Sequence, residues 1–561
     1  MKQGQLSINF IIVIVSALLF IPNLGAVHLF DWDEINFAEC AREMIITGNY
    51  SQVMINYAPF WEKPPLFFWM QVISMKLFGI NEFAARFPNA ICGIITLLAI
   101  YNIGLKHFNQ RFALFWVLAF AGSFLPHFYF KSGIIDPWFN LFIFLGIYYF
   151  ITYSSQYVLV FARKKQEHII VLSAFFIGLA ILTKGPVALL IFCLCSLVYF
   201  IINKFKLFFT FKALLLWCII VFLTGSSWFL IEIARGRLDI VTDFFDYQVR
   251  LFNTQDAGHG GPFFYHFIIL LIGCFPASIL AMSAFSKINS PASFNTYFKT
   301  WMLILFWVVL ILFSLVKTKI VHYSSLAYFP LTFLAAWSFN LILERKLKWK
   351  KWMTVLTGII GGLFAIVITL LPILVNYKKE IIASGIIKDD FALGNLQAEV
   401  YWNGLEFLVG LIFLFSVIIT IYLINKKRIE EGVWLLFLSS LITINLSTLI
   451  FVPKIEQYSQ GSAIQFYKYL QKKDVYVETL YFKSYAHLFY TTKKPVINQD
   501  SYNKEWLLKG NIDKPAYFVA RVNKEKEIKE NYSQLYEIYR KNGFVFYKRI
   551  DNRNKITGMN E

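Results

Sequence analysis

Residues 31–65 read DWDEINFAECAREMIITGNYSQVMINYAPFWEKPP, and they follow directly on residues 8–27, an apolar run of membrane-spanning length. The stretch is rich in ionisable side chains, namely Asp31, Asp33, Glu34, Glu39, Glu43, Glu62 and Lys63. Carboxylates beside lipid are costly unless they face water, a cation or a substrate. The stretch therefore predicts a reaction site at a membrane surface.

The composition of the whole chain agrees with a membrane protein. Of 561 residues, 58% are hydrophobic and only 16% are charged, and the mean hydropathy is +0.57. A soluble domain of this size is less apolar, whereas many membrane spans explain these values. The net charge of +19 is scattered over short loops between apolar runs. It therefore indicates membrane orientation and anionic lipid, and we expect no nucleic-acid partner.

Apolar runs of about 18–22 residues recur along the chain, and each is long enough to cross about 30 Å of hydrocarbon. We expect an α-helical polytopic membrane protein with about thirteen transmembrane helices. The expected spans are residues 8–27, 88–106, 112–130, 137–155, 168–183, 186–203, 211–231, 263–285, 300–316, 320–341, 353–375, 404–424 and 432–452.

The charges of the loops between these runs predict the orientation of the chain. With a cytoplasmic N-terminus, basic clusters such as residues 163–165 and 426–428 fall in the cytoplasm, and most loop carboxylates fall on the other side. The positive-inside rule requires this bias. Three long loops, residues 28–87, 232–262 and 376–403, then lie outside the cytoplasm, and long loops usually carry function.

The character of the chain changes after the last apolar run. Residues 455–561 are polar and mixed in charge, with β-rich runs such as VYVETLYF and GFVFYKRI between helix-like stretches. Such alternation predicts a small α/β domain. We therefore expect a transmembrane domain over residues 1–454 and an extracytoplasmic α/β domain over residues 455–561.

Four charged residues of the first loop are candidates for chemistry. Asp33 and Glu34 come directly after the membrane exit, at the depth where a carboxylate meets a lipid headgroup. Glu62 and Lys63 precede two prolines, which hold the chain extended and present both charges at a defined place. A lysine there suits a phosphate, although an ordinary surface Glu–Lys pair is the alternative.

The helix-like segment between these pairs has a simpler interpretation. Glu39 and Glu43 are four residues apart and share one helix face, with Arg42 beside it. For Arg42 and Glu43 we expect a solvated face of an amphipathic helix at the membrane surface.

Further candidates lie where other spans reach the same surface. Asp136, in KSGIIDPW, has Lys131 nearby, and a helix N-cap is its alternative role. Lys184, in LTKGP, lies between two spans with almost no loop, and its alternative is snorkelling to the interface.

The segment KTKIVHYSSLAYFP places Lys317, Lys319, His322 and Tyr323 at the outer mouth of a late span. The non-cytoplasmic side is normally poor in lysine. A phosphate that must be neutralised would explain this concentration of charge.

Evidence in the sequence for a metal is slight. His259, in the glycine-rich loop DAGHGGPFFYH, and Glu62 are a possible pair of ligands for a divalent ion such as Zn, Mg or Mn. The six cysteines show no CxxC pair or Cys/His ligand spacing. We expect no nucleotide cofactor.

Several motifs together resemble one known family. They are DE at 33–34 with the helix-like NFAECAREM, EKPP at 62–65, an outer-face aspartate after the third span, LTKGP, and K-x-x-x-Y at 319–323. In combination they resemble the membrane-embedded glycosyltransferases of the GT-C class. The specific resemblance is to the protein O-mannosyltransferase-like family, which includes bacterial transferases that add aminoarabinose to lipid A.

The resemblance implies roles for residues in the outer loops. Asp33 matches the catalytic aspartate of the first loop, Glu34 its partner and Asp136 the second acid. Lys63 matches the lysine that holds the donor phosphate, with Lys184 or Lys131 as further cations.

Other positions match late-loop and metal-binding residues of the family. Tyr323 and Lys319 match residues that contact the lipid phosphate, and Glu62 and His259 match a divalent-metal pair. Asn36 departs from the family, because aminoarabinose transferases have arginine in their D-E-x-R pattern. This departure removes a cation and weakens the case for lipid A as the acceptor.

The resemblance implies transfer of one hexose or pentose from a polyprenyl phosphate, such as undecaprenyl phosphate, to an acceptor at the outer face of a bacterial inner membrane. The acceptor is expected to be lipid A or another envelope glycan, and the reaction is expected to invert the anomeric centre. Asp33 would be a general base for a hydroxyl acceptor, or would orient groups and stabilise positive charge for a phosphate acceptor. A protein O-glycosyltransferase is the first alternative. A transporter is the second alternative, but the charges of a transporter would be expected at the membrane midplane, whereas here they lie in the outer loops.

Overall fold

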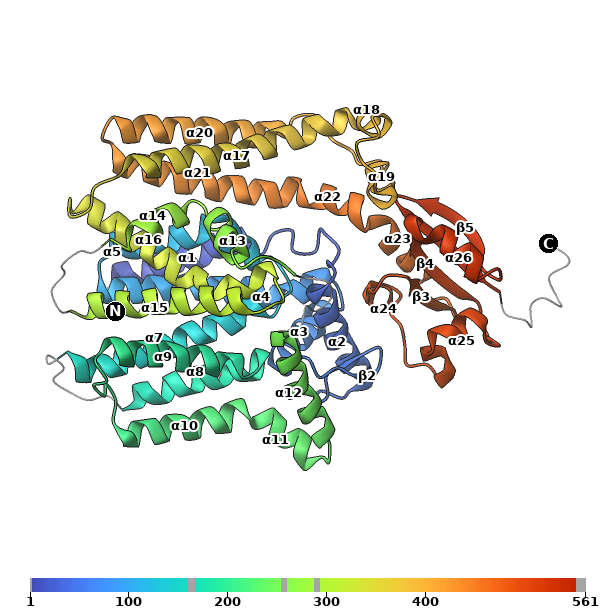
Figure 1. Cartoon of the computed structure of the whole chain (residues 1–561), viewed down its shortest axis with the longest axis horizontal. Coiled ribbons are helices and arrows are strands. Elements are labelled where there is room, and N and C mark those ends of the chain that lie inside the picture. The colour runs from blue at the N-terminus through green and yellow to red at the C-terminus, as the bar shows by residue number, and fades with distance from the viewer. Residues whose placement is uncertain (1–2, 160–166, 254–259, 287–292, 551–561) are drawn as a thin grey trace.

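The computed structural model describes residues 3–159, 167–253, 260–286 and 293–550. Long helices lie side by side in a bundle, and a small sheet with short helices lies against one end of it (Figure 1). The bundle contains α1 (Gln3–Phe20), α4 (Glu82–His107), α5 (Gln110–Ala121), α6 (Phe124–Tyr129), α7 (Asp136–Val158), α8 (His168–Lys184), α9 (Val187–Ile202), α10 (Phe211–Gly225), α11 (Ser227–Ala234), α13 (Tyr265–Gly273), α14 (Ala277–Ser283), α15 (Phe294–Leu315), η1 (Val321–Ala327), α16 (Tyr328–Leu343), α17 (Lys351–Asn376), α20 (Phe407–Asn425) and α21 (Ile429–Ile450).

Length and composition identify membrane-spanning helices in this bundle. Within the described ranges, seven helices are long and apolar enough to cross a membrane, and counting two bent pairs as spans raises the number to nine. Shorter apolar helices, among them α1, α5, α8 and α9, lie beside them. A helical membrane protein is therefore confirmed, and the number thirteen stays a prediction.

Two of the expected spans are bent. Helices α10 and α11 meet at 54°, and α13 and α14 meet at 112°. The second bend lies at Phe275–Pro276, where proline removes a backbone donor and interrupts the helix. The uniform apolar character of residues 263–285 concealed this change of direction.

The two ends of the bundle differ in chemistry. The turn between α16 and α17, residues 344–350, is rich in lysine and lies at the end far from the sheet (Figure 1). The end beside the sheet carries the first-loop elements and the helix that follows α11. These elements are α2 (Asp33–Thr47), β1 (Met54–Ile55), β2 (Ala58–Pro59), α3 (Leu66–Phe78) and α12 (Leu238–Asn253).

Beyond the bundle, the chain forms a four-stranded mixed sheet in the order β3-β4-β6-β5. Strands β3 and β4 are parallel, and the other two pairs are antiparallel. The strands are β3 (Tyr476–Leu480), β4 (Ala516–Arg521), β5 (Tyr536–Lys541) and β6 (Phe544–Arg549). The accompanying helices are α18 (Lys378–Ala383), α19 (Asp390–Leu396), α22 (Val452–Ser459), α23 (Gly461–Leu470), α24 (Ala486–Tyr490), η2 (Gln499–Tyr502), α25 (Lys504–Lys509), η3 (Val522–Lys524) and α26 (Glu525–Asn531).

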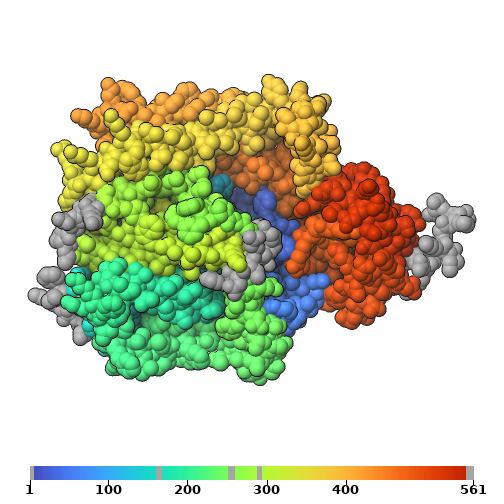
Figure 2. Space-filling model, viewed as in Figure 1, coloured from blue at the N-terminus to red at the C-terminus, as the bar shows by residue number. Residues whose placement is uncertain are grey.

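The first loop and this C-terminal region, residues 461–549, share one hydrophobic core. Phe37 of α2 and Phe68 of α3 belong to the same buried cluster as Phe466, Phe489 and Phe546. Figure 2 shows the C-terminal region seated against the first-loop residues at the end of the bundle. The two segments therefore support each other although the bundle separates them in sequence.

Burial of α2 overturns the expectation of a solvated helix face. Arg42 and Glu43 are both fully buried, and Arg42 donates to the two carboxylate oxygens of Glu39 at 2.7 and 2.6 Å. Glu43 accepts a hydrogen bond of 2.8 Å from the backbone N–H of Tyr57. The expectation was wrong because α24, more than 400 residues away in sequence, packs on α2.

Candidate active site between two cavities

Asp33 begins α2 at the end of the bundle, and its carboxylate remains 29% exposed. Its Oδ2 lies 3.1 Å from Nε2 of His322, which η1 supplies. Burial alone would raise the pKa of Asp33. The nearby His322 imidazole, together with Lys63 and Lys184, outweighs burial and lowers this pKa to about 2. Asp33 is therefore a permanent anion at neutral pH.

Asp136 begins α7 and is almost fully buried. It forms an ion pair with Lys184 at the end of α8, and its Oδ2 lies 3.8 Å from His322 Nε2. A continuous run Asp33–His322–Asp136–Lys184 results, contributed by four separate elements. In this run Lys184 neutralises the buried Asp136, and the His322 imidazole lies between the two carboxylates.

Lys63 adds a second cation to this run. Burial lowers the pKa of Lys63, and it shares the electrostatic environment of Asp33, Asp136 and Lys184. Its Nζ lies 5.2 Å from the ring centroid of Tyr247 in α12. Helix α12 therefore covers the EKPP segment and confines the ammonium group beside the two acids.

A cavity of about 280 Å³ opens beside the two lysines, and we call it the apolar cavity. Its polar groups come from Lys63, Asp136, Asn140, Lys184, Gln248 and Tyr323. Its other walls are mainly hydrophobic side chains, among them Phe139, Val187, Leu190, Ile191, Phe313, Val316 and Leu326. Cations next to apolar walls fit an anionic headgroup with a hydrocarbon tail.

A second cavity of about 690 Å³ lies on the other side of the acids, and we call it the polar cavity. Asp33 and His322 line it, together with Asp31, Lys131 and Arg521 among others. Asp136 and Lys184 line the apolar cavity instead. The acidic run therefore contributes to two cavities, and the larger one has more ionisable side chains in its walls.

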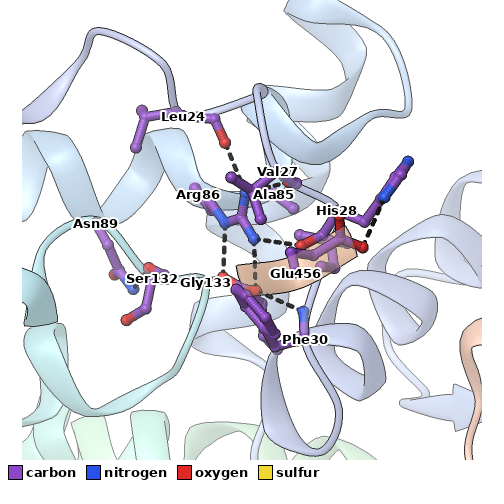
Figure 3. A network of polar contacts seen from close by, with 12 residues as sticks. Leu24, Val27, His28, Phe30, Ala85, Arg86, Asn89, Ser132, Gly133 and Glu456 are labelled. Atoms are coloured by element: carbon purple, nitrogen blue, oxygen red, sulfur yellow. Dashed lines mark hydrogen bonds and ion pairs between the residues drawn. The ribbon is translucent and has the colours of Figure 1, made fainter. Parts of the chain in front are cut away.

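Glu34 is held in a buried network centred on Arg86 of α4 (Figure 3). The Arg86 guanidinium donates to both Glu34 oxygens at 2.8 and 2.7 Å. It also donates to the carbonyls of Leu24, Val27 and His28 at 2.7, 2.6 and 2.9 Å. The network therefore anchors the segment that leads from α1 to α2.

The same carboxylate holds both loops that present the site acids. Glu34 accepts from the N–H of Phe30 at 2.9 Å and from the N–H of Gly133 at 2.5 Å. Each donor lies three residues before a site acid, Asp33 or Asp136. A Cβ on Gly133 would lie only 3.0 Å from Glu34 Cγ, so the close approach requires glycine. Glu34 is thus a positioning residue in this geometry.

Two predicted phosphate ligands lie elsewhere. Lys319 Nζ donates to the carbonyls of Phe313, Ser314 and Val316 at 3.0, 2.7 and 2.5 Å, so it caps the end of α15. Lys131 lines the polar cavity, apart from Lys63 and Lys184. Tyr323 lines the apolar cavity as a phosphate contact would.

The predicted metal pair is only partly described. Glu62 Oε2 accepts a hydrogen bond of 2.9 Å from the Tyr247 hydroxyl, and His259 lies outside the described residues. In the part of the chain that the structure describes, no three His, Cys, Asp or Glu side chains form a metal-binding group. The metal pair therefore stays a prediction, and no step below uses a metal.

Sequence reasoning assigned no role to several residues of the site. His322 was noticed only as part of a lysine-rich segment, and Arg86, Lys483 and Arg521 gave no signal. The last two come from the C-terminal region but line the polar cavity with Asp33. Only folding brings them there.

Comparisons with known proteins agree with this geometry. Residues 62–228 match a family profile described as dolichyl-phosphate-mannose-protein mannosyltransferase. An uncharacterized protein of Aquifex aeolicus is 29% identical over 57% of this chain and 70% of its own length. The undecaprenyl phosphate-alpha-4-amino-4-deoxy-L-arabinose arabinosyl transferase of Pectobacterium atrosepticum is 26% identical over 63% of each chain. The match thus spans less than two thirds of that transferase.

The structural likeness extends over the whole chain. ArnT from Cupriavidus metallidurans, solved with bound undecaprenyl phosphate, superposes with a TM-score of 0.74 at 16% identity and covers 98% of this chain and 99% of its own. At that identity the likeness establishes the fold. The chain therefore has the fold of ArnT, and its residues 62–228 resemble the protein mannosyltransferase family. Among proteins of known name, it is similar to the arabinosyl transferases.

Proposed function

We propose that this protein transfers one sugar from a polyprenyl phosphate, such as undecaprenyl phosphate, to an acceptor outside the cytoplasm. The observation that carries the proposal is the placement of Lys63 and Lys184 in an apolar cavity directly beside Asp33 and Asp136. The similarity to ArnT, solved with undecaprenyl phosphate, supports it.

The apolar cavity takes the donor in this proposal. Its hydrophobic walls receive the first isoprene units, and Lys63 and Lys184 face the phosphate, with Tyr323 beside them. During transfer the bond between the anomeric carbon and the phosphate oxygen breaks, and its electron pair leaves with the phosphate. Preorganised cations stabilise that growing negative charge in a site with little water.

The polar cavity takes the acceptor. Its oxygen forms the new bond to the anomeric carbon from the side of Asp33, while the phosphate leaves toward the apolar cavity. Attack and departure on opposite sides invert the anomeric configuration, and holding both substrates in line lowers the barrier.

The low pKa of Asp33 supports one of the two roles considered for it. A carboxylate with a pKa of about 2 is a weak proton acceptor, so it is poorly matched to activating a hydroxyl at neutral pH. It stabilises instead the positive charge that develops on the sugar. An acceptor phosphate needs no base, so we favour a phosphorylated envelope glycan such as lipid A.

The proposed location is the bacterial inner membrane, with the site and the C-terminal region in the periplasm. The lysine-rich turn between α16 and α17, at the opposite end of the bundle, supports this orientation through the positive-inside rule. The charges of the site gather at one end of the bundle, unlike the midplane sites of transporters.

Donor binding tests the proposal directly. Purified protein in phosphatidylcholine nanodiscs is titrated with undecaprenyl phosphate, and the Lys63→Gln/Lys184→Gln variant is compared with Lys131→Gln. We expect the double variant to lose at least about tenfold in affinity, because two charge-assisted contacts disappear. Lys131→Gln should keep the affinity. Absence of binding by the wild type, or full binding by the double variant, would remove the donor assignment.

A protein acceptor is the second candidate, since the matching family profile describes protein mannosyltransferases. Mass spectrometry of lipid A and of periplasmic proteins, from cells with and without this protein, separates the two. A sugar on lipid A phosphate that depends on this protein supports the favoured acceptor. A sugar on serine or threonine would replace it.

A further inference from the structure

Besides Arg86, which is paired with Glu34, three cations from distant parts of the chain line the polar cavity that contains Asp33. Lys131 lies in the loop between α6 and α7, Lys483 follows β3, and Arg521 ends β4. The last two are exposed, and the C-terminal region contributes them to a cavity whose reactive carboxylate belongs to the first loop.

Aromatic side chains, rather than acids, support the two cations of the C-terminal region. Lys483 Nζ lies 5.0 Å from the ring centroid of Trp32, the neighbour of Asp33 in sequence. The Arg521 guanidinium carbon lies 4.8 Å from the ring centroid of Phe391 and 5.3 Å from that of Phe482. Such contacts hold a cation in place while leaving its N–H donors available.

No described carboxylate lies within 4 Å of the charged nitrogens of Lys483 or Arg521. Asp31, which lines the same cavity, is the acid whose charge couples to Arg521, and its carboxylate is hydrogen-bonded to Ser484. Another lysine of the C-terminal region, Lys514, does pair with an acid, Asp474, at 2.6 Å. Lys483 and Arg521 thus face the cavity without an ion pair to a described carboxylate.

We propose that Lys483 and Arg521 form a subsite for an anionic group, a phosphate or a carboxylate, on the acceptor saccharide. The inference rests on the proposed function, and it adds that the C-terminal region selects the acceptor by charge. Arg521 presents a planar fork of donors suited to either oxyanion, and Lys483 adds a point charge. Lys131 faces the same cavity from the bundle and completes the positive lining.

The subsite explains why the C-terminal region shares its core with the first loop. Rigid attachment through Phe37, Phe68 and Phe466 holds Lys483 and Arg521 at a fixed position relative to Asp33. A bound anion then fixes the acceptor oxygen near the anomeric carbon, which is the geometric requirement of a displacement.

Paired sugar probes test the subsite. Full-length protein in phosphatidylcholine nanodiscs is titrated with N-acetylglucosamine 1-phosphate, glucuronic acid and uncharged N-acetylglucosamine, and separately with undecaprenyl phosphate. The Lys483→Gln/Arg521→Gln variant is compared with Lys494→Gln, an exposed lysine outside the polar cavity. Both substituted cations are exposed, so the variant should fold, and undecaprenyl phosphate binding reports on its folding.

We expect the wild type and Lys494→Gln to bind at least one anionic sugar about tenfold or more tightly than the uncharged sugar. The double variant should lose this preference and keep its affinity for undecaprenyl phosphate. The phosphate and carboxylate probes show which oxyanion is preferred. A preference that survives in the double variant, or that is absent from the wild type while undecaprenyl phosphate binds, would overturn the subsite alone. Failure of the wild type to bind undecaprenyl phosphate would instead overturn the proposed function.

Discussion

His322 connects the two acids of the site, because its Nε2 lies 3.1 Å from Asp33 Oδ2 and 3.8 Å from Asp136 Oδ2. The imidazole thereby holds Asp33 at the polar cavity and keeps its pKa low. Among the described residues, Lys184 forms an ion pair with Asp136 but not with Asp33, so His322 is the side chain that connects the loop after α1 with the start of α7.

Replacing His322 should change the pH dependence of sugar transfer. In His322→Gln, burial continues to act on Asp33 while the stabilising contact with the imidazole is lost, so the pKa of Asp33 rises from about 2. Because Asp33 must be ionised, the acid limb of the rate profile should move up by at least about one pH unit. We expect kcat at neutral pH to fall about a hundredfold as positioning is lost.

A matched control lies at the other end of the bundle. His107→Gln also removes a largely buried histidine, one that bonds to Tyr148 at 3.1 Å, and it should leave the profile in place. An unchanged acid limb in His322→Gln would contradict the link between His322 and Asp33.

The Glu34–Arg86 pair should dominate the stability of this end of the molecule. Arg86→Ala leaves a buried carboxylate without its main partner and frees three backbone carbonyls, so we expect a loss of about 3–5 kcal/mol. Arg86→Lys should recover only part, since lysine cannot make the two-pronged contact. Thermal unfolding in detergent measures both. The exposed pair Arg111–Glu430 supplies the control, because Arg111→Ala should cost about 1 kcal/mol or less.

Lys319 should prove structural. Its Nζ donates to three carbonyls at the end of α15. Lys319→Met should therefore lower the unfolding temperature by several degrees, which is about the effect of losing one or two hydrogen bonds to a charged group. Affinity for undecaprenyl phosphate should stay within about twofold. A tenfold loss of that affinity with unchanged stability would restore the phosphate-binding role that the sequence suggested.

Glu43 should make the protein less stable as pH rises. Burial and the adjacent Glu39 carboxylate raise the pKa of Glu43 in the folded chain above its ordinary value of 4.5. Above pH 4.5 the unfolded chain therefore releases a proton that the folded chain retains, and the free energy of unfolding falls with pH until the folded pKa is passed. Glu43→Gln mimics the protonated acid, so its unfolding temperature should change less than that of the wild type between pH 5.5 and 8.5. Both pH values lie between the ordinary pKa of Glu43, 4.5, and its raised pKa in the folded chain, about 9. The exposed Glu505→Gln should retain the wild-type dependence, and an equal dependence in Glu43→Gln would refute the assignment.

Much of the fold was predictable because apolar runs and loop charges act locally. The helical bundle, the ionisable first loop and a C-terminal segment with alternating strands and helices can all be recognised in the sequence. The bend at Phe275–Pro276 was missed because hydropathy carries no information on direction. The burial of Arg42 and Glu43 was missed because a partner more than 400 residues away covers them.

The sequence by itself determined that this is a membrane protein with acids and lysines gathered at one surface, since the length of the apolar runs and the charges of the loops between them are local properties of the chain. Only the tertiary structure decided which of those charges meet. It placed His322 between Asp33 and Asp136, removed Glu34 and Lys319 into structural networks, and brought Lys483 and Arg521 to the polar cavity. The reason is physical, because a buried charge is stabilised by the partners within a few ångströms, and in this chain those partners come from segments far apart in sequence.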